Sequence, residues 1–180
     1  MDLVRLAPNQ ASEPHVRRYA VQRRYSLSEF TPPIVRTHML IRRPASLVYG
    51  AFIDPSVTSK FWFTRGSGML VCGEKITWYW DMYGASAQVE VLELEQDQRI
   101  LIGWPTPVEW VFSPRGKDAT FVTITASGFS GSEGEQVSGA IDSMGGFSFL
   151  LAGCKAWLEH GIQLKLVDDH NPDHHVQNHA

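Results

Sequence analysis

The sequence predicts an α+β protein in which a curved antiparallel sheet of about six strands wraps around one long C-terminal helix. The first observation is a series of strand-like runs over residues 73–129, separated by short turn segments with no helix between them. Such a series is typical of an antiparallel meander. The second observation is one apolar stripe at offsets of three and four residues, formed by Phe147, Leu150, Leu151, Cys154, Leu158 and Ile162. A sheet buries such a stripe by curving around the helix.

Two short helices are predicted between the first strand and this meander. Residues 34–43 have the pattern of a strand, and Pro44 can then occupy the first turn of a helix, where a missing N–H is harmless. Asp54 and Pro55 end that helix and start a second one, because Asp caps a helix and Pro fits its first turn. The second helix leads into three consecutive aromatic residues, 61–63.

The two ends of the chain differ from the middle. Residues 1–33 contain four prolines and two arginine pairs but little apolar periodicity, so we expect an N-terminal arm, to which we assign no function. Residues 167–180 are polar and predict a disordered tail. The folded domain is therefore expected at residues 34–166.

Composition excludes several classes of protein. The chain has 180 residues, a formal net charge of -3 and two cysteines without a CxxC spacing. This balance predicts no nucleic-acid partner, no membrane partner, no metal site and no disulfide. The tail histidines lack the fixed geometry that a metal site needs. No phosphate-binding loop is present, so we expect no cofactor, and the N-terminus lacks a secretion signal, so we expect a cytoplasmic protein.

Aromatic residues gather on one face of the predicted sheet. Ile76, Trp78 and Trp80 alternate with polar neighbours and therefore share one face, which we expect to lie toward the helix. The later strands repeat this alternation with Trp104, Trp110 and Phe112. Two interpretations stay open, because rings on a concave face form either a close-packed core or the wall of a partly open pocket.

The sequence predicts no catalytic residue. Glu109 alternates against apolar neighbours and should point outward, whereas the direction of Glu90 is ambiguous, because apolar residues at 92 and 94 share its parity. His38 and His160 are each better explained as satisfied or exposed side chains than as catalytic ones. Cys154 belongs to the apolar stripe and has no visible base partner.

The order of these elements resembles the SRPBCC superfamily, in the branch named after the activator of heat-shock protein 90 ATPase. The resemblance covers residues 34–166 and rests on the segments 44–63, 100–104, 108–129 and 145–161 together with the strand that carries Trp78 and Trp80. It implies the helix-grip fold, with a deep apolar cavity open near the two short helices. Phe147 departs mildly from the family pattern, in which a tryptophan commonly follows the glycine of the last helix.

We therefore predict that the domain binds a small apolar or aromatic molecule between the sheet and the last helix. The predicted ligand-binding residues are Trp62, Phe63, Trp78, Trp80, Glu90, Trp104, Trp110, Phe112, Phe147 and Leu151. One alternative, suggested by the resemblance, is an enzyme of the polyketide cyclase or dehydratase type, which requires an inward-facing acid or histidine among Glu90, Glu109 and His38. Another is a cochaperone, although the chain offers no separate chaperone-binding domain and we expect no chaperone contact. The sequence also allows a homodimer.

Overall fold

The computed structural model describes residues 29–176, so the greater part of the predicted arm and the last four residues lie outside it. The elements run in the order β1 (Val35–Ile41), α1 (Ala45–Ile53), α2 (Pro55–Thr58), β2 (Arg65–Gly66), β3 (Lys75–Trp80), η1 (Asp81–Tyr83), β4 (Ala85–Glu95), β5 (Arg99–Trp104), β6 (Thr106–Pro114), β7 (Thr120–Ala126), α3 (Glu133–His160) and η2 (Pro172–His174).

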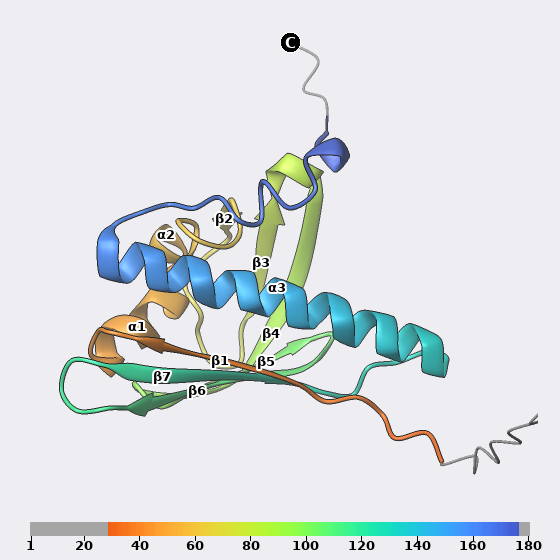
Figure 1. The fold of residues 1–180 in the computed structure, drawn as a ribbon, viewed down its shortest axis with the longest axis horizontal. Coiled ribbons are helices and arrows are strands. Elements are labelled where there is room, and N and C mark those ends of the chain that lie inside the picture. Colours follow the sequence, from red (N-terminus) through yellow and green to blue (C-terminus); the bar gives the residue numbers. More distant parts are fainter. Residues whose placement is uncertain (1–28, 177–180) are drawn as a thin grey trace, which may run out of the picture.

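One curved antiparallel sheet forms the body of the domain. Its seven strands are ordered β1-β7-β6-β5-β4-β3-β2, and α3 lies across the concave face (Figure 1). The predicted fold class is confirmed: an α+β helix-grip fold with two short helices after the first strand. The strand missing from the prediction is β2, whose two residues pair with Trp78 and Tyr79 of β3 and are too short to show any periodicity.

Helix α3 begins earlier than its apolar stripe suggests. Ser132 accepts a hydrogen bond from the Glu135 amide, and the Glu135 carboxylate accepts one from the Ser132 amide at 2.8 Å, which completes a capping box. The segment 130–136, whose glycine, serine and glutamate residues suggest a loop, therefore contains the start of the helix. Gly161 ends it in the left-handed conformation (φ 68°), so Ile162 lies outside the helix and is exposed.

Helix α3 is also long and apolar enough to cross a membrane by length and composition alone. Its inner face instead supplies Leu150, Leu151 and Cys154 to the core of the domain, where all three are fully buried. A core helix has the same composition as a spanning helix, so this property carries no membrane assignment.

The chain after α3 returns over the domain and contacts the tip of the β3–β4 hairpin (Figure 1). The Tyr83 hydroxyl donates to the Val167 carbonyl, and the Val176 amide donates to the Met82 carbonyl at 2.8 Å. The ring of His175 lies 5.3 Å from that of Tyr83. The sequence predicts disorder from residue 167, and the structure differs in placing residues 167–176 against the domain.

Candidate ligand-binding site

The aromatic residues of the concave face form one connected cluster beneath α3. Ile76, Trp78 and Trp80 share a face of β3 as predicted, with the first two buried and Trp80 half-buried. Trp104 comes from β5, Trp110 from β6 and Phe147 from α3. The cluster therefore joins three strands to the helix.

Trp62 stands at the centre of this cluster. Its ring centroid lies 4.6 Å from that of Trp78, 5.6 Å from that of Trp104 and 5.6 Å from that of Phe63. Trp80 and Trp104 stack nearly parallel beside it, 5.9 Å apart and 9° from coplanar. Offset and edge-to-face arrangements at these distances are the favoured geometries of aromatic pairs.

Trp62 belongs to the loop Ser59–Thr64, which packs directly against α3. The Trp62 amide donates to the Thr58 carbonyl at 3.0 Å, so the loop continues straight from α2. A Cβ at Gly153 would lie 2.9 Å from the Phe61 carbonyl oxygen, a distance that real Cβ atoms essentially never show. Glycine at this position of the helix therefore permits the approach of the loop.

The rings fill most of the space in which the resemblance implies a deep cavity. A central void of about 10 Å³ remains, lined by Phe52, Trp62, Leu70, Trp78, Ile100 and Trp110. Such a volume is at the lower limit for one water molecule, roughly 10–15 Å³. The structure differs from the expectation of a deep cavity, since Trp62 enters from the loop and packs against the strand residues.

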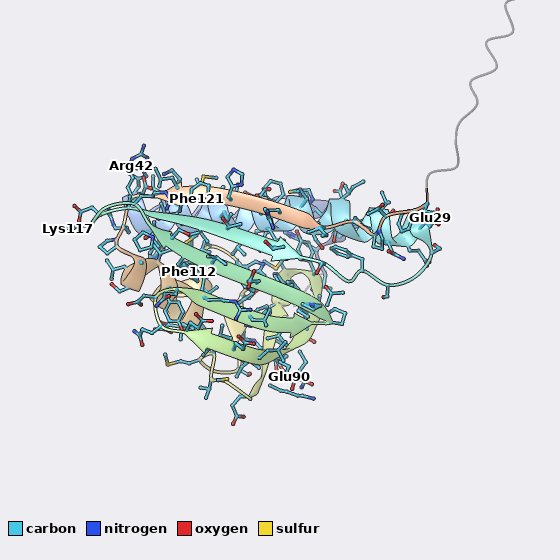
Figure 2. The ribbon with its side chains drawn as sticks, turned by 90° about the horizontal axis from the view of Figure 1, so that it is seen from below. Glu29, Arg42, Glu90, Phe112, Lys117 and Phe121 are labelled. Carbon is cyan, nitrogen blue, oxygen red and sulfur yellow. The ribbon has the colours of Figure 1, made fainter. Side chains whose placement is uncertain are left out.

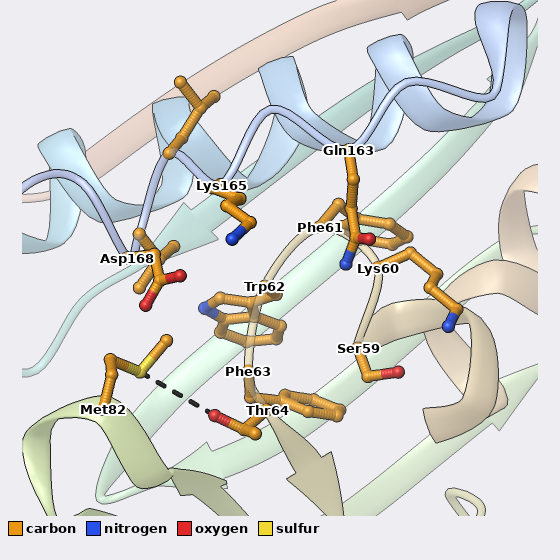
Figure 3. Close-up of a pocket in the computed structure, with 12 residues that line it drawn as sticks. Ser59, Lys60, Phe61, Trp62, Phe63, Thr64, Met82, Gln163, Lys165 and Asp168 are labelled. Carbon is orange, nitrogen blue, oxygen red and sulfur yellow. Dashed lines mark hydrogen bonds between the residues drawn. The ribbon is translucent and has the colours of Figure 1, made fainter. Parts of the chain in front are cut away.

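Two larger hollows open beside Trp62. The β5–β6 hollow, of about 210 Å³, is lined by Trp62, Trp104, Pro105, Thr106, Val108, Ala126, Asp142, Ser143, Gly146 and Phe147. The C-terminal hollow, of about 360 Å³, lies between the Ser59–Thr64 loop and the chain after α3 (Figure 3). Trp62 lines both hollows and also the central void, and it is the one residue that these three spaces share.

The C-terminal hollow is the more polar of the two. Figure 3 shows Lys60, Gln163, Lys165 and Asp168 around it, with the indole of Trp62 among them. Lys165 has a positive φ of 53°, an uncommon conformation for a residue with a side chain. Because these polar groups follow α2 and α3 in irregular segments, no periodic pattern in the sequence indicates them.

The sequence of this chain matches the model of a known protein family. The model of the family described as activator of Hsp90 ATPase homolog 1-like protein matches residues 42–150, more than half of the chain. The chain belongs to this family. The predicted resemblance is thereby confirmed. No curated protein matches the chain.

Solved structures agree with the assignment to the activator of Hsp90 ATPase homolog 1-like family. A protein from Staphylococcus saprophyticus is 27% identical, with a TM-score of 0.66 over 74% of this chain and 96% of that one. An Aha1 dimer from Colwellia psychrerythraea is 17% identical, with a TM-score of 0.60 over 72% and 98%. CalU16 from Micromonospora echinospora is 16% identical, with a TM-score of 0.57 over 78% and 90%. The last two likenesses show the helix-grip fold alone.

Only some of the predicted ligand-binding residues of this family member line one of the two hollows. Trp62, Trp104 and Phe147 line the β5–β6 hollow, and Trp62 and Phe63 line the C-terminal hollow. Phe112 packs instead against Phe52, with ring centroids 5.7 Å apart, and lines neither hollow. Leu151 is fully buried and also lines neither.

Glu90 lies on the outer face of the sheet, away from the ring cluster. Its neighbours Val89 and Val91 are fully buried, whereas Glu90 is exposed beside Gly103 on β5 (Figure 2). A shift of register between Val91 and Glu93 inserts one extra residue, so the inward parity of β4 changes there. This bulge explains why Leu94 packs against the core although it shares the sequence parity of Glu90.

The other acid–base candidates also face outward. The Glu109 carboxylate pairs with Arg99 Nε at 2.5 Å, as the alternation of its strand predicts. His38 is exposed, and its ring lies 5.0 Å from that of Phe121 on the neighbouring strand β7. None of Glu90, Glu109 and His38 therefore reaches the concave face.

Residues 29–176 contain neither a cluster of metal ligands nor, at Cys154, a reactive thiol. Over residues 29–176, no three His, Cys, Asp or Glu side chains lie close enough together to hold a metal ion. Cys154 is fully buried in the core as predicted, and burial raises the pKa of its thiol, which keeps it protonated and unreactive at neutral pH.

A groove of larger volume than either hollow lies elsewhere. It has about 690 Å³ and runs along α1 between Leu47, Met69, Leu94 and Leu158. It contains none of the predicted ligand-binding residues, and its apolar side chains Leu47 and Met69 are exposed. The groove is therefore separate from the ring cluster.

Proposed function

We propose that this protein binds a small apolar or aromatic molecule at the β5–β6 hollow, between the sheet and α3. The observation that carries the proposal is the convergence of Trp62, Trp104 and Phe147 on one open hollow from a loop, a strand and a helix. Apolar rings with a few polar groups at the rim are the usual lining of a small-molecule site. Here the rim is supplied by Thr106, Asp142 and Ser143.

The size of the hollow limits the ligand. Its volume of about 210 Å³ is smaller than the ~300–1,000 Å³ typical of sites for drug-sized molecules. The ligand is therefore either of the size of one or two fused rings, or it gains room by moving a lining side chain. Trp104 lines the hollow and is half-buried, and its ring is held in place by stacking on Trp80.

Geometry favours binding over catalysis. The cyclase or dehydratase alternative requires an acid or histidine directed inward, and Glu90, Glu109 and His38 lie on the outer face. The remaining acid at the hollow, Asp142, is exposed at its rim. Among its lining residues, the hollow therefore has no buried acid that could serve as a general acid or base.

Equilibrium binding of a neutral apolar fluorophore tests this proposal. N-phenylnaphthylamine should bind the wild type, and Trp104→Ala should weaken its binding by about fivefold to 150-fold, because stacking on one ring contributes ~1–3 kcal/mol. Glu90→Gln is the matched control on the same sheet and should leave the affinity unchanged. The proposal fails if Trp104→Ala, with its fold intact by circular dichroism, binds the fluorophore as well as the wild type does.

Three expectations from the sequence stay predictions. A cytoplasmic location, a homodimer and the lack of a chaperone contact each need their own measurement. One solved structure with the same fold is described as an Aha1 dimer. Light scattering on the purified full chain would give its mass in solution, and an ATPase assay with added chaperone would detect any stimulation.

A further inference from the structure

The indole N–H of Trp110 is a buried donor without a partner. The side chain is 2% exposed, and its Nε1 atom has no hydrogen-bond partner within residues 29–176. Most buried polar groups in native proteins are paired, because an unpaired one has lost its hydrogen bonds to water without replacement. This donor therefore requires an explanation.

The surroundings of Trp110 do not supply an acceptor. The rings nearest to it are those of Phe52, Trp62 and Phe147, with centroids 6.2 to 6.3 Å away. A ring face is a weaker acceptor than an oxygen atom. The central void beside Trp110 is otherwise lined by Phe52, Trp62, Leu70, Trp78 and Ile100.

A trapped water molecule does not resolve this. A buried water needs about two to four polar partners, whereas the side chains around this void are apolar apart from the indole N–H groups, which only donate. The void, of about 10 Å³, is also at the lower limit of size for water. The missing partner is better supplied by an acceptor that arrives with a ligand.

Trp62 is the one residue shared by the void beside Trp110 and the two hollows. Its ring packs against those of Trp78, Trp104 and Trp110, with centroids 4.6, 5.6 and 6.3 Å away. It is carried by a loop outside regular structure, where side-chain movement is less restricted than in a strand or helix. If the Trp62 side chain moved, the three spaces would join into one cavity of the size that holds drug-sized molecules, with Trp110 in its wall.

We infer that the ligand of this site is a flat, neutral aromatic compound with a carbonyl oxygen, which displaces Trp62 and accepts a hydrogen bond from Nε1 of Trp110. This inference rests on the proposed function and names the ligand class of the same site. The acceptor must be neutral, because the ring cluster contains no cation to compensate a buried carboxylate. Lys60 and Lys165 line the C-terminal hollow, outside the ring cluster.

The test compares two probes that differ in one acceptor, acetylnaphthalene and ethylnaphthalene. The preference of a protein is its affinity for acetylnaphthalene divided by its affinity for ethylnaphthalene. This preference should be about tenfold larger for the wild type than for Trp110→Phe, because one neutral hydrogen bond contributes a free energy of that order. Comparing this preference between the two proteins cancels the different solubilities of the two probes. In ¹H–¹⁵N spectra, the indole signal that is present in the wild type and absent from Trp110→Phe belongs to Trp110. Acetylnaphthalene should shift this signal downfield, whereas ethylnaphthalene should not.

The role of Trp62 has its own variant. Trp62→Ala should bind both probes more tightly and keep the preference for acetylnaphthalene; Trp62→Phe serves if the alanine variant does not fold. If the probes bind but Trp110→Phe keeps the same preference and the Trp110 signal responds equally to both, the inference is wrong and the proposed function survives. If neither probe binds the wild type or the Trp62 variants, the proposed function fails together with it.

Discussion

The two halves of the domain are packed differently under the same helix. The aliphatic half, where β1, β7 and the second half of α3 meet, contains Val122, Ile124, Leu150, Leu151 and Cys154, all completely buried. The aromatic half consists of the ring cluster around Trp62, where Trp80 and Trp104 stay partly exposed and hollows open on two sides. Close packing thus coexists with open space in one domain.

This difference separates stability from binding. Branched aliphatic side chains interlock to the density of an organic crystal and leave no room for a guest. Large flat rings pack with gaps at their edges, and a ring carried by a loop can move without unfolding a strand. We therefore expect substitutions in the aliphatic half to lower the free energy of unfolding, and those in the aromatic half to change ligand affinity first.

The largest expected effect tests the aliphatic half. Leu151→Ala should lower the free energy of unfolding by ~2–5 kcal/mol, because it removes a fully buried side chain and leaves a cavity. Urea unfolding followed by far-UV circular dichroism measures it. Trp104→Phe, in the aromatic half, should cost clearly less, since Trp104 is half-buried at the edge of a hollow. Equal costs would contradict the division into two halves.

A smaller effect is expected where the halves touch. Gly153→Ala places a Cβ 2.9 Å from the Phe61 carbonyl oxygen, and a backbone atom cannot rotate away. The substitution should cost ~1–3 kcal/mol through displacement of the Ser59–Thr64 loop. It should also change the near-ultraviolet circular dichroism of the ring cluster and the affinity for N-phenylnaphthylamine.

The same helix provides the control. A Cβ added at Gly145 would meet no neighbouring element within 4 Å, so Gly145→Ala should stabilise α3 by up to ~1 kcal/mol through helix propensity. Opposite signs for the two glycine substitutions would place the effect in the loop contact. If both were stabilising, the loop would be free to retreat from α3, and the close approach would have no part in holding Trp62.

The sequence predicts the fold well because the fold depends on periodicity. The alternation of Ile76, Trp78 and Trp80 and the helical spacing of Leu150, Leu151 and Cys154 each assign a face without knowledge of any partner. The early start of α3 was also present in the sequence, as the Ser132–Glu135 capping box, but it lies in a segment whose glycines suggest a loop. The two-residue strand β2 has no such signal.

The site was less predictable because it depends on what fills a volume. Periodicity places Trp78, Trp104 and Trp110 on the concave face, and the structure brings them together. Periodicity does not show that Trp62 enters from a loop and occupies the space between these three side chains. The direction of Glu90 was ambiguous for a related reason, since a bulge changes strand parity without a mark in the sequence.

The smallest expected effect concerns the end of α3, where Glu159 joins the helix to the residue that follows β1. The Glu159 side chain is 6% exposed, and its carboxylate accepts hydrogen bonds from Lys155 Nζ at 2.5 Å and from the Arg42 amide at 2.6 Å. Burial alone would raise the pKa of Glu159, but these hydrogen bonds and the two positive charges outweigh burial and lower it. Glu159→Gln should therefore cost ~1 kcal/mol at pH 7, since the amide still accepts from Arg42 but loses the charge-assisted bond to Lys155.

The pH dependence of this cost has a definite sign. A carboxyl group with a lowered pKa in the folded state contributes stability above its unfolded pKa, here near 4.5, and loses it as the pH falls through the folded value. The difference in unfolding free energy between wild type and Glu159→Gln should thus be constant from pH 7 to about pH 5 and shrink below that. Glu95→Gln, at an exposed pair with Arg99, should show little difference at any pH. A gap for Glu159→Gln that persists at pH 3 would mean that shape rather than charge holds the end of α3 against β1.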